Sequence, residues 1–123
     1  MQRIVNCKLN IDRFIDSKKE SSFFEGKGYY KCDNDEIIVF FESNEIKYKY
    51  IYKDSCLTIM CNNSKYRFKE NEKCLGEIKN GDYVFKITTL ANKIEVSDSY
   101  IILNYSLYQN DLLGNYSTRL SFN

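Results

Sequence analysis

The sequence contains no histidine, no tryptophan and no proline. Without histidine, the Ser–His and Cys–His pairs of nucleophilic catalysis cannot form, and a zinc site lacks one of its usual ligands. The five glycines are scattered and none precedes a helix, which excludes a glycine-rich phosphate loop. We therefore do not expect an enzyme, and we expect neither a metal nor another cofactor.

Net charge and long apolar runs are also scarce. The formal net charge is +1, so no overall field draws the chain to nucleic acid or to anionic lipid. The longest apolar run, Ile37 to Phe41, is far too short to span a bilayer, and we expect no membrane insertion. The residues from Met1 to Lys8 mix apolar with polar side chains and do not resemble a signal peptide. These features favour a cytoplasmic protein.

Cysteine is present in an odd number, five, and without C-x-x-C spacing. Cys56 and Cys61 lie on one expected strand, but their odd separation points them to opposite faces, so one metal ion cannot be held by both. In a reducing cytoplasm we expect all five to be free thiols that pack as small hydrophobes.

The dominant pattern that is present is an alternation of apolar and polar residues from Val5 to Phe122. This period of two is typical of half-buried antiparallel strands. The 123 residues form one domain, and strands at regular spacing predict a single antiparallel barrel of eight to ten strands. Gly26 and Gly28 lie inside an expected strand and indicate a sharp bend. The expected strands cover residues 3–14, 22–32, 36–42, 46–53, 56–61, 65–70, 74–79, 82–91 with an extension to 96, 100–108, and a last strand after a connection at 110–114.

Several short segments occur in the same order in a known family. They are Gly28-Tyr29-Tyr30, Tyr66-Arg67-Phe68, Gly81 followed by Tyr83 to Thr89, Tyr105-Ser106-Leu107, and the Gly114 turn before the final strand. In this order of features the chain resembles the YwiB-like family of small β-barrel proteins of uncharacterised function. The resemblance implies an all-β, calycin- or lipocalin-like barrel and supplies no catalytic residues. The chain departs from the family where Ile78 to Gly81 replaces a Thr-Pro-Tyr-Gly stretch, and it lacks the Gly-x-Trp of lipocalins.

Tyrosines dominate the expected inner face of the barrel. Buried tyrosines need partners for their hydroxyl groups, so Tyr50, Tyr83, Tyr105 and Tyr116 are candidates to line a pocket for a ligand. A barrel of this size is filled by its side chains or holds one small ligand. The leading hypothesis is non-catalytic binding of a small apolar or amphipathic molecule.

Two other functions remain open. Tyr48, Tyr50 and Tyr52 alternate with lysines, but a platform for single-stranded nucleic acid needs both on one surface, and strand geometry separates them. Nucleic acid is therefore the least favoured partner.

The second hypothesis, ahead of nucleic-acid binding, is a protein-interaction module or homodimer without a ligand. In the strand at 36–42 both faces are apolar. If residues 71–75 or 14–23 do not cover its outer face, Ile38 and Phe40 are the stripe that a symmetric dimer would bury.

Overall fold

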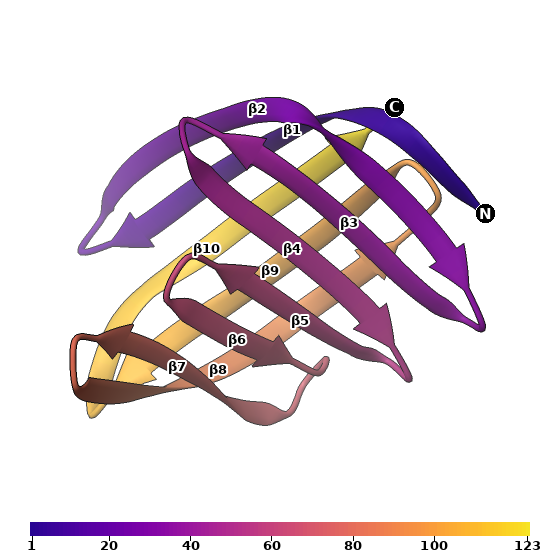
Figure 1. Ribbon diagram of the computed structural model, residues 1–123. Helices are drawn as coiled ribbons and strands as arrows, with labels where there is room; N and C mark the ends of the chain where they lie inside the picture. The colour runs from indigo at the N-terminus through magenta and orange to yellow at the C-terminus, as the bar shows by residue number, and fades with distance from the viewer.

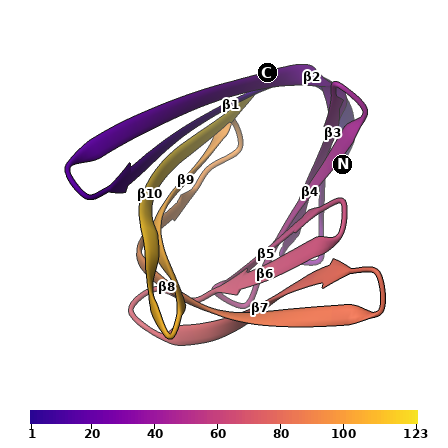
Figure 2. The same ribbon diagram turned by 90° about the vertical axis from the view of Figure 1, so that its left-hand side faces the viewer.

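The computed structural model describes all residues from Met1 to Asn123 and contains ten antiparallel strands and no helix. The strands close into one barrel in which each strand lies beside its neighbours in the sequence, and β1 pairs with β10 (Figures 1 and 2). The prediction of a single antiparallel barrel of eight to ten strands is confirmed. The strands are β1 (Gln2–Ile15), β2 (Lys18–Asp33), β3 (Glu36–Ser43), β4 (Ile46–Lys53), β5 (Cys56–Cys61), β6 (Ser64–Phe68), β7 (Lys73–Asn80), β8 (Tyr83–Val96), β9 (Tyr100–Gln109) and β10 (Asp111–Phe122).

Two strand starts differ from the sequence prediction. β2 begins at Lys18 rather than at residue 22, because the polar residues expected to form a connection pair directly with β1. β10 begins at Asp111 rather than after Gly114, because a bulge between Leu112 and Gly114 keeps it paired with β9. In both cases the turn is shorter, and the hairpin longer, than the sequence predicts.

The short turns between the strands are built from polar residues with positive φ. In four of them both central residues have φ between 49° and 66°, the geometry of two-residue hairpin turns that match the twist of the flanking strands. Asn and Asp tolerate this region better than other residues with side chains. The four pairs are Asp16-Ser17, Asn34-Asp35, Asn44-Glu45 and Asp54-Ser55.

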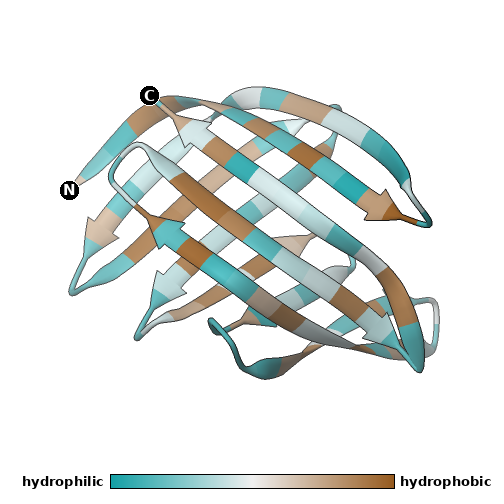
Figure 3. Cartoon of the chain, turned by 180° about the vertical axis from the view of Figure 1, so that it is seen from behind, coloured by the Kyte–Doolittle hydropathy of each residue, from teal (hydrophilic) through white to brown (hydrophobic).

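The alternation in the sequence places one face of every strand inside the barrel (Figure 3). The fully buried side chains form a continuous core whose largest members are Phe41, Phe68 and Phe122. Removal of this apolar surface from water is the main term that stabilises the fold.

Gly26 and Gly28 allow β2 to bend sharply over the end of β3. A Cβ atom on Gly28 would overlap the carbonyl oxygen of Phe40, and one on Gly26 would overlap that of Glu42. These glycines therefore permit a close approach of two backbones at a corner of the barrel.

The barrel has two different ends. The turns that join β1 to β2, β3 to β4, β5 to β6, β7 to β8, and β9 to β10 lie at one end, which faces the viewer in Figure 2. We call it the tyrosine end, for the tyrosines described below. The opposite end, where both chain termini lie, is called the terminal end.

Candidate functional site

The inner face near the tyrosine end is lined by a series of aromatic rings. Phe68, 1% exposed, packs against Tyr105 with ring centroids 4.7 Å apart. Tyr105 in turn stacks on Tyr116, with centroids 4.8 Å apart and an interplanar angle of 8°. Tyr66 lies beside Phe68, and Tyr66, Tyr105 and Tyr116 are all half-buried. The series therefore leads from the packed interior to the solvent.

Tyr50 lies deeper, on β4, with 4% of its surface exposed. Every side-chain nitrogen or oxygen that is sealed from solvent has a hydrogen-bond partner. The hydroxyl of Tyr50 has no hydrogen bond to the protein, so it must face a space that water can reach. A buried phenol without a protein partner is unusual and indicates a position for a water molecule or for a polar group of a ligand.

Arg13 lies at the outer limit of this aromatic series. It stands opposite Tyr116 in the β1–β10 pairing, and its Nη2 donates a hydrogen bond of 2.8 Å to the carbonyl oxygen of Leu113. Its Nη1 lies 3.5 Å from Oε2 of Glu20, whose side chain is 68% exposed. A hydrogen bond to Tyr116 is the main cause that raises the pKa of Arg13, so the guanidinium stays charged.

A second arginine lies at the terminal end. Arg3 lies over the ring of Tyr30, with Cζ 4.3 Å from the ring centroid, and donates a hydrogen bond of 2.6 Å to the carbonyl oxygen of Asp98. Below it, Phe122 and Val39 are completely buried. Arg3 therefore covers the packed rings at this part of the terminal end.

The phenols of Tyr48, Tyr50 and Tyr105 and the thiol of Cys7, buried inside the barrel, are neutral at physiological pH. Burial raises the pKa of Tyr48 to about 12 and raises those of Tyr50 and Tyr105. Burial also raises the pKa of the Cys7 thiol to about 12, and no cysteine is bonded to another. The inner face therefore offers neutral phenol groups with one fixed positive charge, that of Arg13, at its open end.

The predicted ligand-binding residues divide into two groups. Tyr50, Tyr105 and Tyr116 lie together on the inner face, as expected. Tyr83 does not: it is 74% exposed, so its expected inward position is wrong. Residues 83–87 of β8 pair only with β7, because the pairing with β9 begins at Thr88, and the hairpin therefore extends beyond the barrel.

Arg13 was missed at the sequence level. The signal was available in the alternation itself, because Arg13 continues the inward row of Leu9 and Ile11 on β1. Its position opposite Tyr116 depends on the closure of the barrel, which sequence periodicity does not specify.

The outer face of β3 carries the predicted interface residues. Ile38 and Phe40 are half-buried, and the ring of Phe40 stacks on Tyr29 with centroids 5.5 Å apart. Tyr29 pairs with Ile4, which is 83% exposed, so the apolar surface continues onto β1. The two segments considered as intramolecular covers are themselves parts of the sheet, at β1–β2 and β7.

The lysines and tyrosines of β4 lie on opposite faces of the sheet. Tyr48 and Tyr50 are buried inside, whereas Lys47 is exposed outside. These residues do not form one surface with stacking rings and cations.

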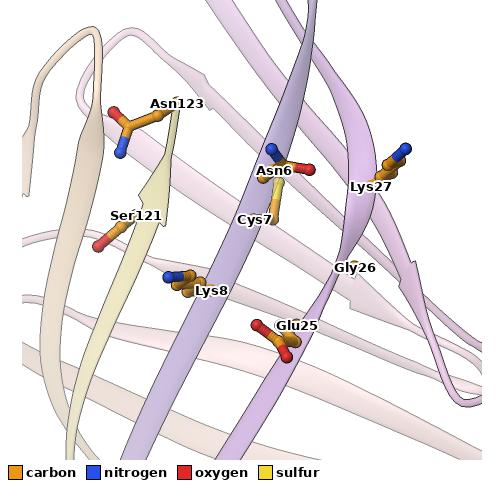
Figure 4. A pocket seen from close by; sticks show the side chains of 8 residues that line it. All are labelled: Asn6, Cys7, Lys8, Glu25, Gly26, Lys27, Ser121 and Asn123. Atoms are coloured by element: carbon orange, nitrogen blue, oxygen red, sulfur yellow. The ribbon is translucent and has the colours of Figure 1, made fainter.

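The five main hollows on the surface have volumes of about 290–450 Å³, and none of these five is lined by Tyr50, Tyr105 or Tyr116. One, of about 380 Å³, lies across β10, β1 and β2 and is lined by Asn6, Cys7, Lys8, Glu25, Gly26, Lys27, Ser121 and Asn123 (Figure 4). Its polar groups include Lys8 and Glu25, which face each other across the β1–β2 pair. It has no aromatic lining and therefore does not suit an apolar ligand.

The architecture has a counterpart among solved structures. The crystal structure of the ywiB protein from Bacillus subtilis superposes with a TM-score of 0.84, over 98% of this chain and 91% of that chain, at 11% sequence identity. The chain has the fold of the ywiB protein. The resemblance drawn from the sequence is thus confirmed at the level of the fold. No family model matches the chain, and no curated protein matches it.

No group of histidine, cysteine, aspartate or glutamate side chains is close enough to hold a metal ion. The structure also contains no helix that could cross a membrane.

Proposed function

We propose that the protein binds a small amphipathic molecule, without catalysis, between the aromatic rings at the tyrosine end of a calycin-like barrel. The observation that carries this proposal is the hydroxyl of Tyr50, which is buried, lacks a protein partner and faces a space that water can reach. A polar atom of a ligand would satisfy this hydroxyl.

The half-buried rings above Tyr50 supply the apolar contact surface. Tyr66, Tyr105 and Tyr116 are partly accessible, and aromatic side chains give much contact area for little loss of rotamer freedom. Because the five main hollows lie elsewhere, we expect a ligand to enter by displacing these rings.

The test is titration of the protein with N-phenylnaphthylamine, an uncharged probe whose fluorescence rises in apolar surroundings. We expect saturable binding, and we expect Tyr66→Ala and Tyr116→Ala each to weaken it about fivefold or more, as for aromatic residues that anchor a ligand. Tyr83→Ala is the matched control, because it removes a ring that lies outside the barrel. Native mass spectrometry of the protein from its own host would then report the mass of a bound natural ligand.

Absence of saturable binding to the wild type would refute the proposal. So would an equal loss of affinity in Tyr83→Ala and Tyr116→Ala, because the probe would then bind outside the barrel.

The outer face of β3 supports a second candidate function, self-association. Ile38 and Phe40 continue into an apolar stripe with Tyr29 and the exposed Ile4, and no other element of the chain covers it. A symmetric dimer would bury the same stripe on both copies.

Analytical ultracentrifugation of the wild type and of Phe40→Lys tests this second candidate. A dimer that Phe40→Lys dissociates would support it. A wild type that is monomeric at about 100 µM, or a dimer that the substitution leaves intact, would remove this surface from consideration.

A further inference from the structure

Arg13 is a cation that lies directly beside the aromatic rings. It continues the inward row of β1, stands opposite Tyr116 and forms the outer limit of the ring series. Lys47 on β4 points outward because it alternates with buried tyrosines, and Lys18, which pairs with Ile15 in the β1–β2 hairpin, is exposed beyond Arg13. A molecule between the rings would therefore meet the positive charge of Arg13 first as it leaves the barrel.

The contacts of Arg13 fix its direction but leave it able to bind. A hydrogen bond of 2.8 Å from Nη2 to the carbonyl oxygen of Leu113 holds the guanidinium in place, beside Tyr116 in the β1–β10 pairing. Its remaining ionic partner, Glu20, is 3.5 Å away and 68% exposed, so it is a weak partner in water. A guanidinium has five N–H donors, and the bond to Leu113 uses only one of them, so donors remain for an anion that displaces Glu20.

We propose that the ligand is an anionic amphiphile whose negatively charged head group binds Arg13 and whose apolar body lies between the tyrosine rings. This inference rests on the proposed function and adds the sign of charge and the orientation of the ligand. A carboxylate, a sulfonate or a phosphate monoester all present the oxygen pair that a guanidinium binds. In this arrangement the head group takes the place of Glu20 beside Arg13.

Two probes with the same ring skeleton separate this inference from the proposed function. N-phenylnaphthylamine is uncharged, and anilinonaphthalene sulfonate carries one sulfonate on the same rings. We expect Arg13→Met to weaken the sulfonate probe about tenfold or more and the neutral probe less than about twofold, as expected for a charge-assisted bidentate hydrogen bond. Arg13→Lys, which keeps the charge but loses the fork, should fall between the wild type and Arg13→Met.

Glu20 competes with the ligand for Arg13, so removal of its carboxylate should strengthen binding instead of weakening it. We expect Glu20→Gln to tighten binding of the sulfonate probe about two- to fivefold, because the guanidinium then has no resident counter-ion. Glu25→Gln, on the outer face of the same strand, changes the net charge equally and should leave the affinity unchanged. Arg3→Met is the corresponding control for Arg13→Met, at the terminal end of the barrel. Thermal unfolding of each variant shows that it is folded before it is titrated.

Displacement of the neutral probe by decanoate and by decanol extends the test to a carboxylate. Decanoate should compete better than decanol in the wild type, and the two should compete equally in Arg13→Met. If both probes bind but respond alike to Arg13→Met, the charge inference is overturned while the proposed function stands. If neither probe binds the wild type, the proposed function fails and this inference fails with it.

Discussion

Tyr50 provides the sharpest test of how the interior of the barrel is built, because its ring and its hydroxyl make opposite contributions to the free energy of unfolding. The ring is almost completely buried, with 4% of the residue exposed. Truncation by Tyr50→Ala removes this ring from a closed core and should lower the free energy of unfolding by about 3–5 kcal/mol, as for other large buried aromatic residues.

Tyr50→Phe keeps the ring and removes only the hydroxyl. In the free protein that hydroxyl has no protein partner, and burial of a polar group without full compensation costs about 1–3 kcal/mol in protein mutants. Water that reaches the hydroxyl recovers part of this cost, so Tyr50→Phe should leave the free energy of unfolding unchanged or raise it by up to about 1 kcal/mol. The affinity for N-phenylnaphthylamine should change little, because this probe depends on the rings.

Urea unfolding followed by circular dichroism measures both variants against the wild type at one pH. If the slope of the free energy of unfolding against urea concentration is unchanged, the substitution has altered only the stability. A loss of more than about 1 kcal/mol in Tyr50→Phe would refute the reasoning, because it is the loss expected when a hydrogen bond to the protein is broken. A loss below about 0.5 kcal/mol in Tyr50→Ala would show instead that the residue is not in the core.

Three further predictions concern the backbone, the phenols and the thiols. Gly28→Ala should lower the free energy of unfolding by more than about 2 kcal/mol in the same urea assay, because its Cβ would overlap the Phe40 carbonyl. The control is Gly81→Asn, at a turn with φ of 63° and no neighbour within 4 Å, which should change the free energy of unfolding by less than about 1 kcal/mol. Burial raises the pKa values of Tyr48 and Tyr50 above the unfolded value near 10, so their contribution to the free energy of unfolding is complete below about pH 10 and is lost above it, at about 1.4 kcal/mol per pH unit for each group. Tyr50→Phe should therefore reduce the slope of stability against pH, and a stability that is constant between about pH 10 and pH 12 would contradict the prediction. Thiol titration of the denatured protein without reductant should find five free thiols, and a count of three or one would contradict this expectation. In the folded protein Cys7 should not react, because it is 0% exposed and burial raises its pKa to about 12.

The sequence by itself determined the strands and their faces. Side chains alternate across a strand with period two, so Tyr48 and Tyr50 had to share a face, opposite to Lys47. Turn positions were also readable from local chemistry, since Asn and Asp accept the positive φ that short hairpin turns require. The fold class followed from these local rules, because strands so patterned must bury one face, and closure removes their exposed edges.

The tertiary structure decided which inward residues are enclosed and which are accessible. Tyr83 and Tyr50 share the inward phase of their strands, yet Tyr83 is 74% exposed and Tyr50 is 4% exposed. The cause is the length of neighbouring strands: β9 pairs with β8 only from Thr88 onward, so the β7–β8 hairpin extends beyond the barrel. Periodicity gives the direction of a side chain, but it does not say whether a third strand is present to cover it.

The candidate site likewise depends on which strands are neighbours in the closed barrel. Arg13 and Tyr116 lie near opposite ends of the chain and become neighbours because β1 pairs with β10 and closes the barrel. The unpartnered hydroxyl of Tyr50 likewise reflects the volumes of all the side chains that converge on the interior. Local propensity acts over a few residues, whereas closure and packing depend on the register between distant strands. Closure and packing therefore place the charge of Arg13 and the hydroxyl of Tyr50, on which binding would depend.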